Sequence, residues 1–152
     1  MAANDFRVAF SNAVSIANPY SIKANTTGPL VGELVIVDSN AGYVALPANG
    51  ASNSSVWVGL VVSVETAVTA SADGKVMVVD DPTTMFVGKA TTPANLAIAL
   101  KNTQVTLDLA GGVYTIDEND SVNGTFIIKD FDNTTDGNVY FQFASNDHVS
   151  AG

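Results

Sequence analysis

The stretch Val56–Val64 restricts the folds open to this chain more than any other feature. It is almost entirely apolar and rich in valine, a composition typical of a β-strand that is buried on both faces. Gly59 lies inside it and indicates either a β-bulge or the close approach of another backbone. The stretch therefore gives the strongest strand signal in the sequence.

Short apolar runs alternate with turn residues along most of the remaining chain. We predict three hairpins, formed by Leu34–Val37 with Tyr43–Leu46, Val56–Val64 with Lys75–Val79, and Thr125–Lys129 with Val139–Phe143. Further strands are expected at Met85–Gly88, Gln104–Leu109 and Val113–Ile116. Turn signals recur roughly every 8–12 residues, which is typical of all-β folds. The sequence therefore predicts an all-β fold, either a compact β-barrel or a sandwich.

One segment has the signals of a helix rather than a strand. Thr92 followed by Pro93 is typical of a helix start, with an N-cap residue and proline at the first helical position. The segment Ala94–Lys101 then contains helix formers with apolar side chains at helical spacing. We expect one short helix here.

The two ends of the chain differ from the strand-rich part. The sequence between Phe6 and Ile22 contains apolar side chains without a clear period, and Pro19 and Pro29 interrupt it. We therefore predict an extended N-terminal arm over 1–27, a β-barrel or sandwich domain over 28–145 and a flexible tail over 146–152.

Three aromatic residues lie in the predicted arm, where a local core is difficult to build. They are Phe6, Phe10 and Tyr20. An arm with spaced aromatic side chains could dock on a neighbouring subunit by adding an edge strand. We expect these residues to contact a partner.

The charge of the chain disfavours two kinds of partner. Its net charge is −9, and its six basic residues form no cluster. Nucleic-acid binding requires a basic surface that neutralises phosphates, so we expect no nucleic-acid partner. Anionic membrane surfaces are disfavoured for the same reason. The N-terminus lacks a signal-peptide pattern, and the apolar runs are too short to span a bilayer, so no membrane association is expected.

The sequence contains few residues able to carry out catalysis. It has no cysteine, and its one histidine, His148, lies in the polar tail, where we expect it to be exposed. A Ser-His-Asp triad needs an oriented, buried histidine, and a zinc site needs several His or Cys ligands. We expect no catalytic residue, no cofactor and no enzyme activity.

Most of the fifteen acidic residues lie in predicted turns, where aspartate hydrogen-bonds the local backbone. The loop carrying Asp130, Asp132 and Asp136 offers oxygen ligands and is a weak candidate for calcium. It does not match an EF-hand, because Phe143 stands where that motif needs glutamate. Asp117–Asp120 forms a second acidic loop. Three acids lie in or near strands and are expected to protect sheet edges: Glu33, Glu65 and Asp108.

Several short motifs form a familiar pattern: Gly32–Val35, Trp57–Val61, Lys75–Val79 and the segment Asp80–Phe86, which reads D-D-P-x-x-x-F. Together they resemble the capsid decoration (cement) proteins of tailed phages. The resemblance covers about 28–143, and Asp108–Gly112 departs from the family pattern, which has G-x-S-G after the helix.

This resemblance implies a structural virion protein. It would bind the outer surface of a capsid shell, with the lattice of the major capsid protein as its partner, and stabilise that shell. It would do so as a homo-oligomer, often a trimer, on the capsid exterior, and the family has no catalytic residues to transfer.

Two other functions remain open from the residues alone. The chain could be a β-rich tail, fibre or surface adhesin module with calcium-dependent stability. It could also be an enzyme that uses a pair of carboxylates, as glycoside hydrolases do.

Overall fold

The structure is a computed structural model, which describes residues 6–10, 17–48, 56–122, 124–132, 137–144 and 148–149. The side chain of Phe10 lies outside the described part. The fold is all-β, as predicted, and its strands form two antiparallel sheets.

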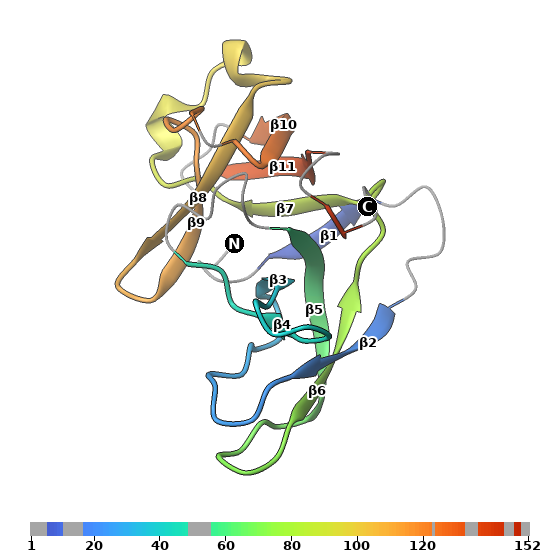
Figure 1. The fold of residues 1–152 in the computed structure, drawn as a ribbon. Coiled ribbons are helices and arrows are strands. Elements are labelled where there is room, and N and C mark those ends of the chain that lie inside the picture. The colour runs from blue at the N-terminus through green and yellow to red at the C-terminus, as the bar shows by residue number, and fades with distance from the viewer. Residues whose placement is uncertain are drawn as a thin grey trace.

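One sheet has six strands and the other has five (Figure 1). The order of the six-stranded sheet is β1 (Arg7–Phe10), β7 (Met85–Lys89), β11 (Asn138–Phe143), β10 (Phe126–Asp132), β8 (Gln104–Ala110) and β9 (Val113–Asp117). The order of the five-stranded sheet is β2 (Ala17–Ile22), β6 (Gly74–Val79), β5 (Trp57–Thr66), β3 (Leu34–Val37) and β4 (Val44–Ala45).

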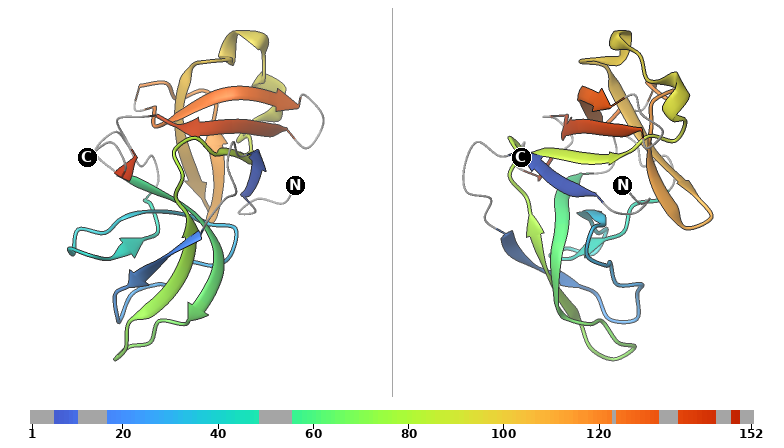
Figure 2. Two further views of the ribbon diagram at one scale, coloured as in Figure 1. Left: turned by 90° about the vertical axis from the view of Figure 1, so that its right-hand side faces the viewer. Right: turned by 180° about the vertical axis from the view of Figure 1, so that it is seen from behind.

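The two sheets pack as a sandwich in which the five-stranded sheet curls into a half-barrel. Figure 2 shows the six-stranded sheet above and the five-stranded sheet below, with β5 running down from their junction. A parallel bridge between Ser21 and Tyr43 brings the β4 side of the lower sheet back towards β2. A similar bridge between Ala90 and Ile116 links the end of β7 to β9.

Strand β5 contributes to two hydrophobic clusters. Trp57 and Leu60 face the core between the sheets, where Trp57 packs against an aromatic group consisting of Phe126 at 4.8 Å, Phe143 at 5.6 Å and, beyond them, Phe86 and Phe141. Val58 and Val61 belong to a separate valine-rich cluster within the curl of the five-stranded sheet. The first half of β5 is therefore buried on both faces, which confirms the prediction for this stretch.

Gly59 lies where two strands approach closely. A Cβ atom at this position would lie 1.9 Å from the carbonyl oxygen of Val79 on β6. The pairing of β3 with β5 also shifts register between Val35 and Ile36, opposite Gly59 and Trp57. The predicted close approach is confirmed, and the three predicted hairpins are also present as β3–β4, β5–β6 and β10–β11.

The predicted helix is not confirmed. Its segment forms two single-turn 3-10 helices, at Pro93–Asn95 and Ile98–Leu100, because the backbone of Leu96 and Ala97 between them is extended. Leu96 is buried in the core between the sheets, and anchoring its side chain there takes precedence over the weak helix preference of so short a segment. None of the helices in the described ranges is long and apolar enough to cross a membrane.

The separate N-terminal arm is not confirmed either. Phe6 is 3% exposed in the core, and β1 pairs with β7. Strand β2 pairs with β6 along its whole length, and Pro19 is tolerated because β2 ends the order of its sheet. The described residues of 1–27 thus supply one strand to each sheet.

The expectation that His148 is exposed is wrong. This residue is 2% exposed, and it forms an isolated parallel bridge with Trp57 at the start of β5. Its burial was not apparent from the sequence, because the residues before it are polar and because it depends in part on Trp57 and Val58, which lie far away in the sequence.

Candidate protein-binding surface

A short turn beside β5 presents two large apolar side chains to solvent. The backbone N–H of Glu33 donates to the carbonyl of Leu30 at 3.2 Å, which closes a β-turn over these residues. Gly32, the third residue of the turn, has a φ of 90°, a conformation that glycine adopts without strain. The turn places Leu30 and Val31 at 67% and 59% exposure.

Hydrogen bonds hold this turn firmly against both sheets. The Glu33 carboxylate accepts the backbone N–H of Leu30 at 2.7 Å. Gly32 donates to the carbonyl of Val61 at 2.9 Å, and its own carbonyl accepts the N–H of Phe6 at 3.0 Å. Glu33 is only 9% exposed, so the expectation that it protects a sheet edge from outside is wrong; its carboxylate supports the turn instead.

The exposed residues of the turn lie next to exposed residues of β5, and together they form what we call the apolar strip: Leu30, Val31, Val62 and Val64. Leu30 and Val64 line a groove of about 230 Å³ that opens into the curl of the five-stranded sheet. Val31 and Val62 line a second groove of about 280 Å³, which Phe6, Arg7 and Val8 border on the β1 side. Large apolar side chains gathered on a surface are typical of a protein contact.

The structure assigns different surroundings to the three predicted contact residues. Phe6 is 3% exposed and packs edge-on against Phe141 at 6.0 Å, and it also borders the second groove. The side chain of Phe10 lies outside the described residues. Tyr20 is half-buried, and its hydroxyl donates to the Asp80 carboxylate at 2.6 Å. Burial, together with this hydrogen bond and the charge of Asp80, raises the pKa of Tyr20 well above its usual range.

The calcium candidates do not come together in the described part of the chain. The carboxylate of Asp130 forms an ion pair with Lys101 at 2.7 Å, and this contact holds the pKa of Asp130 below its usual range. Asp132 is half-buried at the end of β10, and Asp136 lies outside the described residues. Within the described ranges, no group of three or more histidine and acidic side chains is placed to hold a metal ion.

The acidic loop Asp117–Asp120 has its carboxylates engaged in turn geometry. Asp117 accepts the backbone N–H of Asn119 at 3.1 Å, and Asp120 accepts that of Val122 at 3.0 Å. Glu118 is 3% exposed and accepts the side-chain amide of Asn119 at 2.9 Å. The contacts of Asp117 and Asp120 are those expected of aspartate in turns. Of the other strand acids, Glu65 is exposed and Asp108 half-buried.

The segment Asp80–Phe86, part of the motif resemblance, forms the turn between β6 and β7 and the first two residues of β7. Asp81 accepts the backbone N–H of Thr83 at 2.8 Å, and Phe86 is fully buried. No protein-family model, curated protein or solved structure matches the chain.

The apolar strip was missed by the sequence analysis. The sequence feature that could have revealed it is the pair Leu30-Val31 between Pro29 and Gly32. Two large apolar residues inside a turn have no neighbouring apolar residues in the sequence with which to form a core. Val62 and Val64 could not be recognised, because the run Val56–Val64 does not tell which valines face solvent.

Proposed function

We propose that this chain is a non-enzymatic structural protein that attaches to the outer surface of a tailed-phage capsid shell and stabilises it. The apolar strip is the observation that carries this proposal. Four large apolar side chains, each at least 38% exposed, lie together on a turn and a strand that hydrogen bonds hold rigidly in place. A rigid, preformed apolar surface loses little entropy on binding, which favours attachment to another protein.

The lattice of the major capsid protein is the proposed partner. The short motifs at Gly32–Val35, Trp57–Val61 and Asp80–Phe86 support this choice through their resemblance to decoration proteins. The net charge of −9 also fits an outer layer, since like-charged particles repel one another and remain dispersed.

Stabilisation of the shell would follow from mass action. A protein that binds only the assembled lattice lowers the free energy of that lattice by its own binding free energy. In the trimeric form proposed here, each trimer presents three copies of the strip, and simultaneous contacts increase the avidity.

The proposal is tested by co-sedimentation with undecorated tailed-phage shells, after the solution mass is measured by light scattering. We expect a trimer that pellets with shells up to a saturating ratio. The double variant Val31→Asp with Val62→Asp places two charges on the strip and should remain in the supernatant. Val122→Asp is the matched control, because Val122 is 85% exposed away from the strip and its variant should still pellet. Equal pelleting of both variants would exclude the strip as the contact, and a wild-type protein that never pellets would contradict shell binding.

A further inference from the structure

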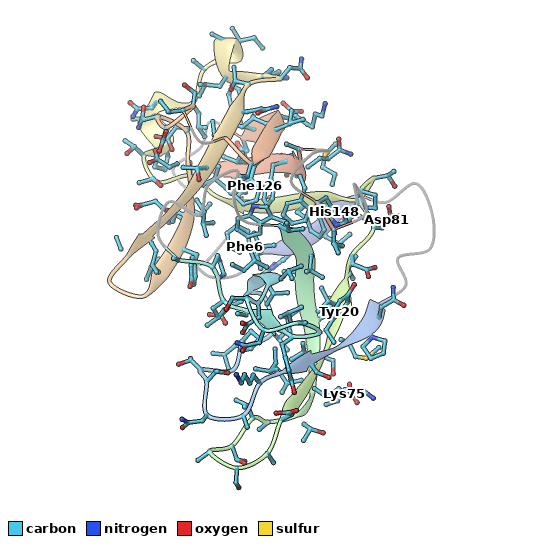
Figure 3. All side chains as sticks on the ribbon, in the orientation of Figure 1. Phe6, Tyr20, Lys75, Asp81, Phe126 and His148 are labelled. Atoms are coloured by element: carbon cyan, nitrogen blue, oxygen red, sulfur yellow. The ribbon has the colours of Figure 1, made fainter. Side chains whose placement is uncertain are left out.

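The only histidine and the only tryptophan of the chain are joined at the junction of the two sheets. The ring nitrogen Nε2 of His148 lies 2.9 Å from the carbonyl oxygen of Val58. The imidazole also packs on Phe143, with ring centroids 5.5 Å apart, and Phe143 stacks on Trp57 at 5.6 Å. Figure 3 shows His148 near Asp81 at the upper end of β5.

This geometry determines where protons can reside on the ring. A carbonyl oxygen can only accept a hydrogen bond, so Nε2 carries the proton of the neutral imidazole. A second proton must be added to Nδ1 of a residue that is 2% exposed and stacked against an aromatic ring. Charging a group in such a place is unfavourable, because water that would solvate the cation is excluded.

The charged groups that act on the ring among the described residues are Asp80 and Asp81, on the turn after β6. The start of β5 and the end of β11 bring Trp57, Val58 and Phe143 against it, none of which titrates. Burial lowers the pKa of His148, and this effect outweighs the opposing effects of the Val58 hydrogen bond and of the two carboxylates.

We propose that His148 is an acid-sensitive latch, which holds residues 148–149 against the start of β5 while its ring is neutral and releases them when the ring is protonated. Release uncovers Phe143 and the edge of Trp57, whereas both sheets keep their hydrogen bonds. The latched state is most stable above the ordinary histidine pKa of 6.5 and loses stability as the pH falls from there, because the released ring binds protons more readily. This inference is independent of shell binding.

Two measurements on the full chain test the latch. The C2 proton of the single imidazole gives the pKa of His148 directly by NMR, and we expect a value below 6.5. Trp57 fluorescence reports on the aromatic core, and its emission maximum should move to longer wavelength over the same pH range, while the far-ultraviolet circular dichroism stays unchanged.

Two variants separate release from general acid effects. His148→Gln keeps a donor for the Val58 carbonyl but cannot be charged, so its emission should not change between pH 8 and 5. His148→Ala should have the red-shifted emission at every pH. The latch is excluded if the pKa lies at or above 6.5, if wild type and His148→Gln shift alike, or if the sheets unfold with the emission change. The first two criteria hold even if His148→Ala does not fold.

Discussion

Gly59→Ala is the substitution for which the structure gives the clearest expected cost. Gly59 does not have a φ in the left-handed region, so alanine could adopt its backbone conformation. Considered by backbone entropy alone, the change would stabilise the fold by about 0.4–1 kcal/mol. The new Cβ atom, however, would lie 1.9 Å from the Val79 carbonyl oxygen and 2.8 Å from its carbonyl carbon. Backbone entropy and steric overlap therefore predict opposite signs for the change in the free energy of unfolding.

The size of the cost follows from the distance. Real Cβ atoms essentially never come closer than 3.0 Å to such an atom, so β5 and β6 must separate by about 1 Å at this point. The opposing atoms are backbone and cannot rotate away. Overpacking usually costs about 1–3 kcal/mol, and a disturbed ladder hydrogen bond costs about 1 kcal/mol more. We expect a loss of about 3 kcal/mol in the free energy of unfolding.

Urea denaturation followed by Trp57 fluorescence measures this loss. With an m-value of about 2 kcal/mol/M, the midpoint should fall by about 1.5 M. Gly111→Ala is the control, since no atom lies within 4 Å of its added Cβ and only its φ of +60° opposes the change. That variant should lose about 1 kcal/mol, the cost of a left-handed backbone conformation for a residue with a Cβ atom. A Gly59→Ala protein as stable as wild type would refute the close approach of β5 and β6.

Three further predictions concern individual contacts. Lys101→Met should raise the pKa of Asp130, since the Lys101 hydrogen bond is the main cause of its lowering; a carboxyl titration by NMR checks this. A lowered carboxyl pKa stabilises the folded state at pH values above the unfolded pKa of about 3.9. Wild type should therefore lose this stabilisation on acidification, whereas the variant has none to lose. Asp80→Asn should lower the raised pKa of Tyr20 only in part, because burial is the larger cause, and an ultraviolet titration referenced to Tyr20→Phe would detect it. In wild type the raised pKa makes the fold lose stability as the pH rises above about 10, where the unfolded tyrosine ionises first. Trp57→Ala should cost about 3–5 kcal/mol, measured by denaturation followed by circular dichroism, because it removes the largest side chain of the core; a loss below 1 kcal/mol would contradict the packing described.

The strands and hairpins were predictable because their signals are local. β-branched runs and turn residues define β3 to β6 and the β10–β11 hairpin, and Gly59 marked the close approach inside the strongest strand. In contrast, the pairing of β1 with β7 joins residues far apart in the sequence, so no local hydrophobic pattern could predict it.

The errors share one physical cause, which is tertiary packing. Leu96 is drawn into the core, and the segment around it cannot continue as a helix. His148 is buried by Phe143 and by the backbone of β5, although the residues before it in the chain are polar. The apolar strip likewise depends on a turn lying beside β5, a contact that no sequence spacing shows.

The measurement that tests shell attachment most directly is a cryo-electron microscopy reconstruction of undecorated tailed-phage shells mixed with this protein. Attachment through the apolar strip predicts added density on the outer face of the shell, with the Leu30–Glu33 turn and β5 turned towards the capsid protein. Shells without added density, or a bound protein whose strip faces solvent, would contradict it.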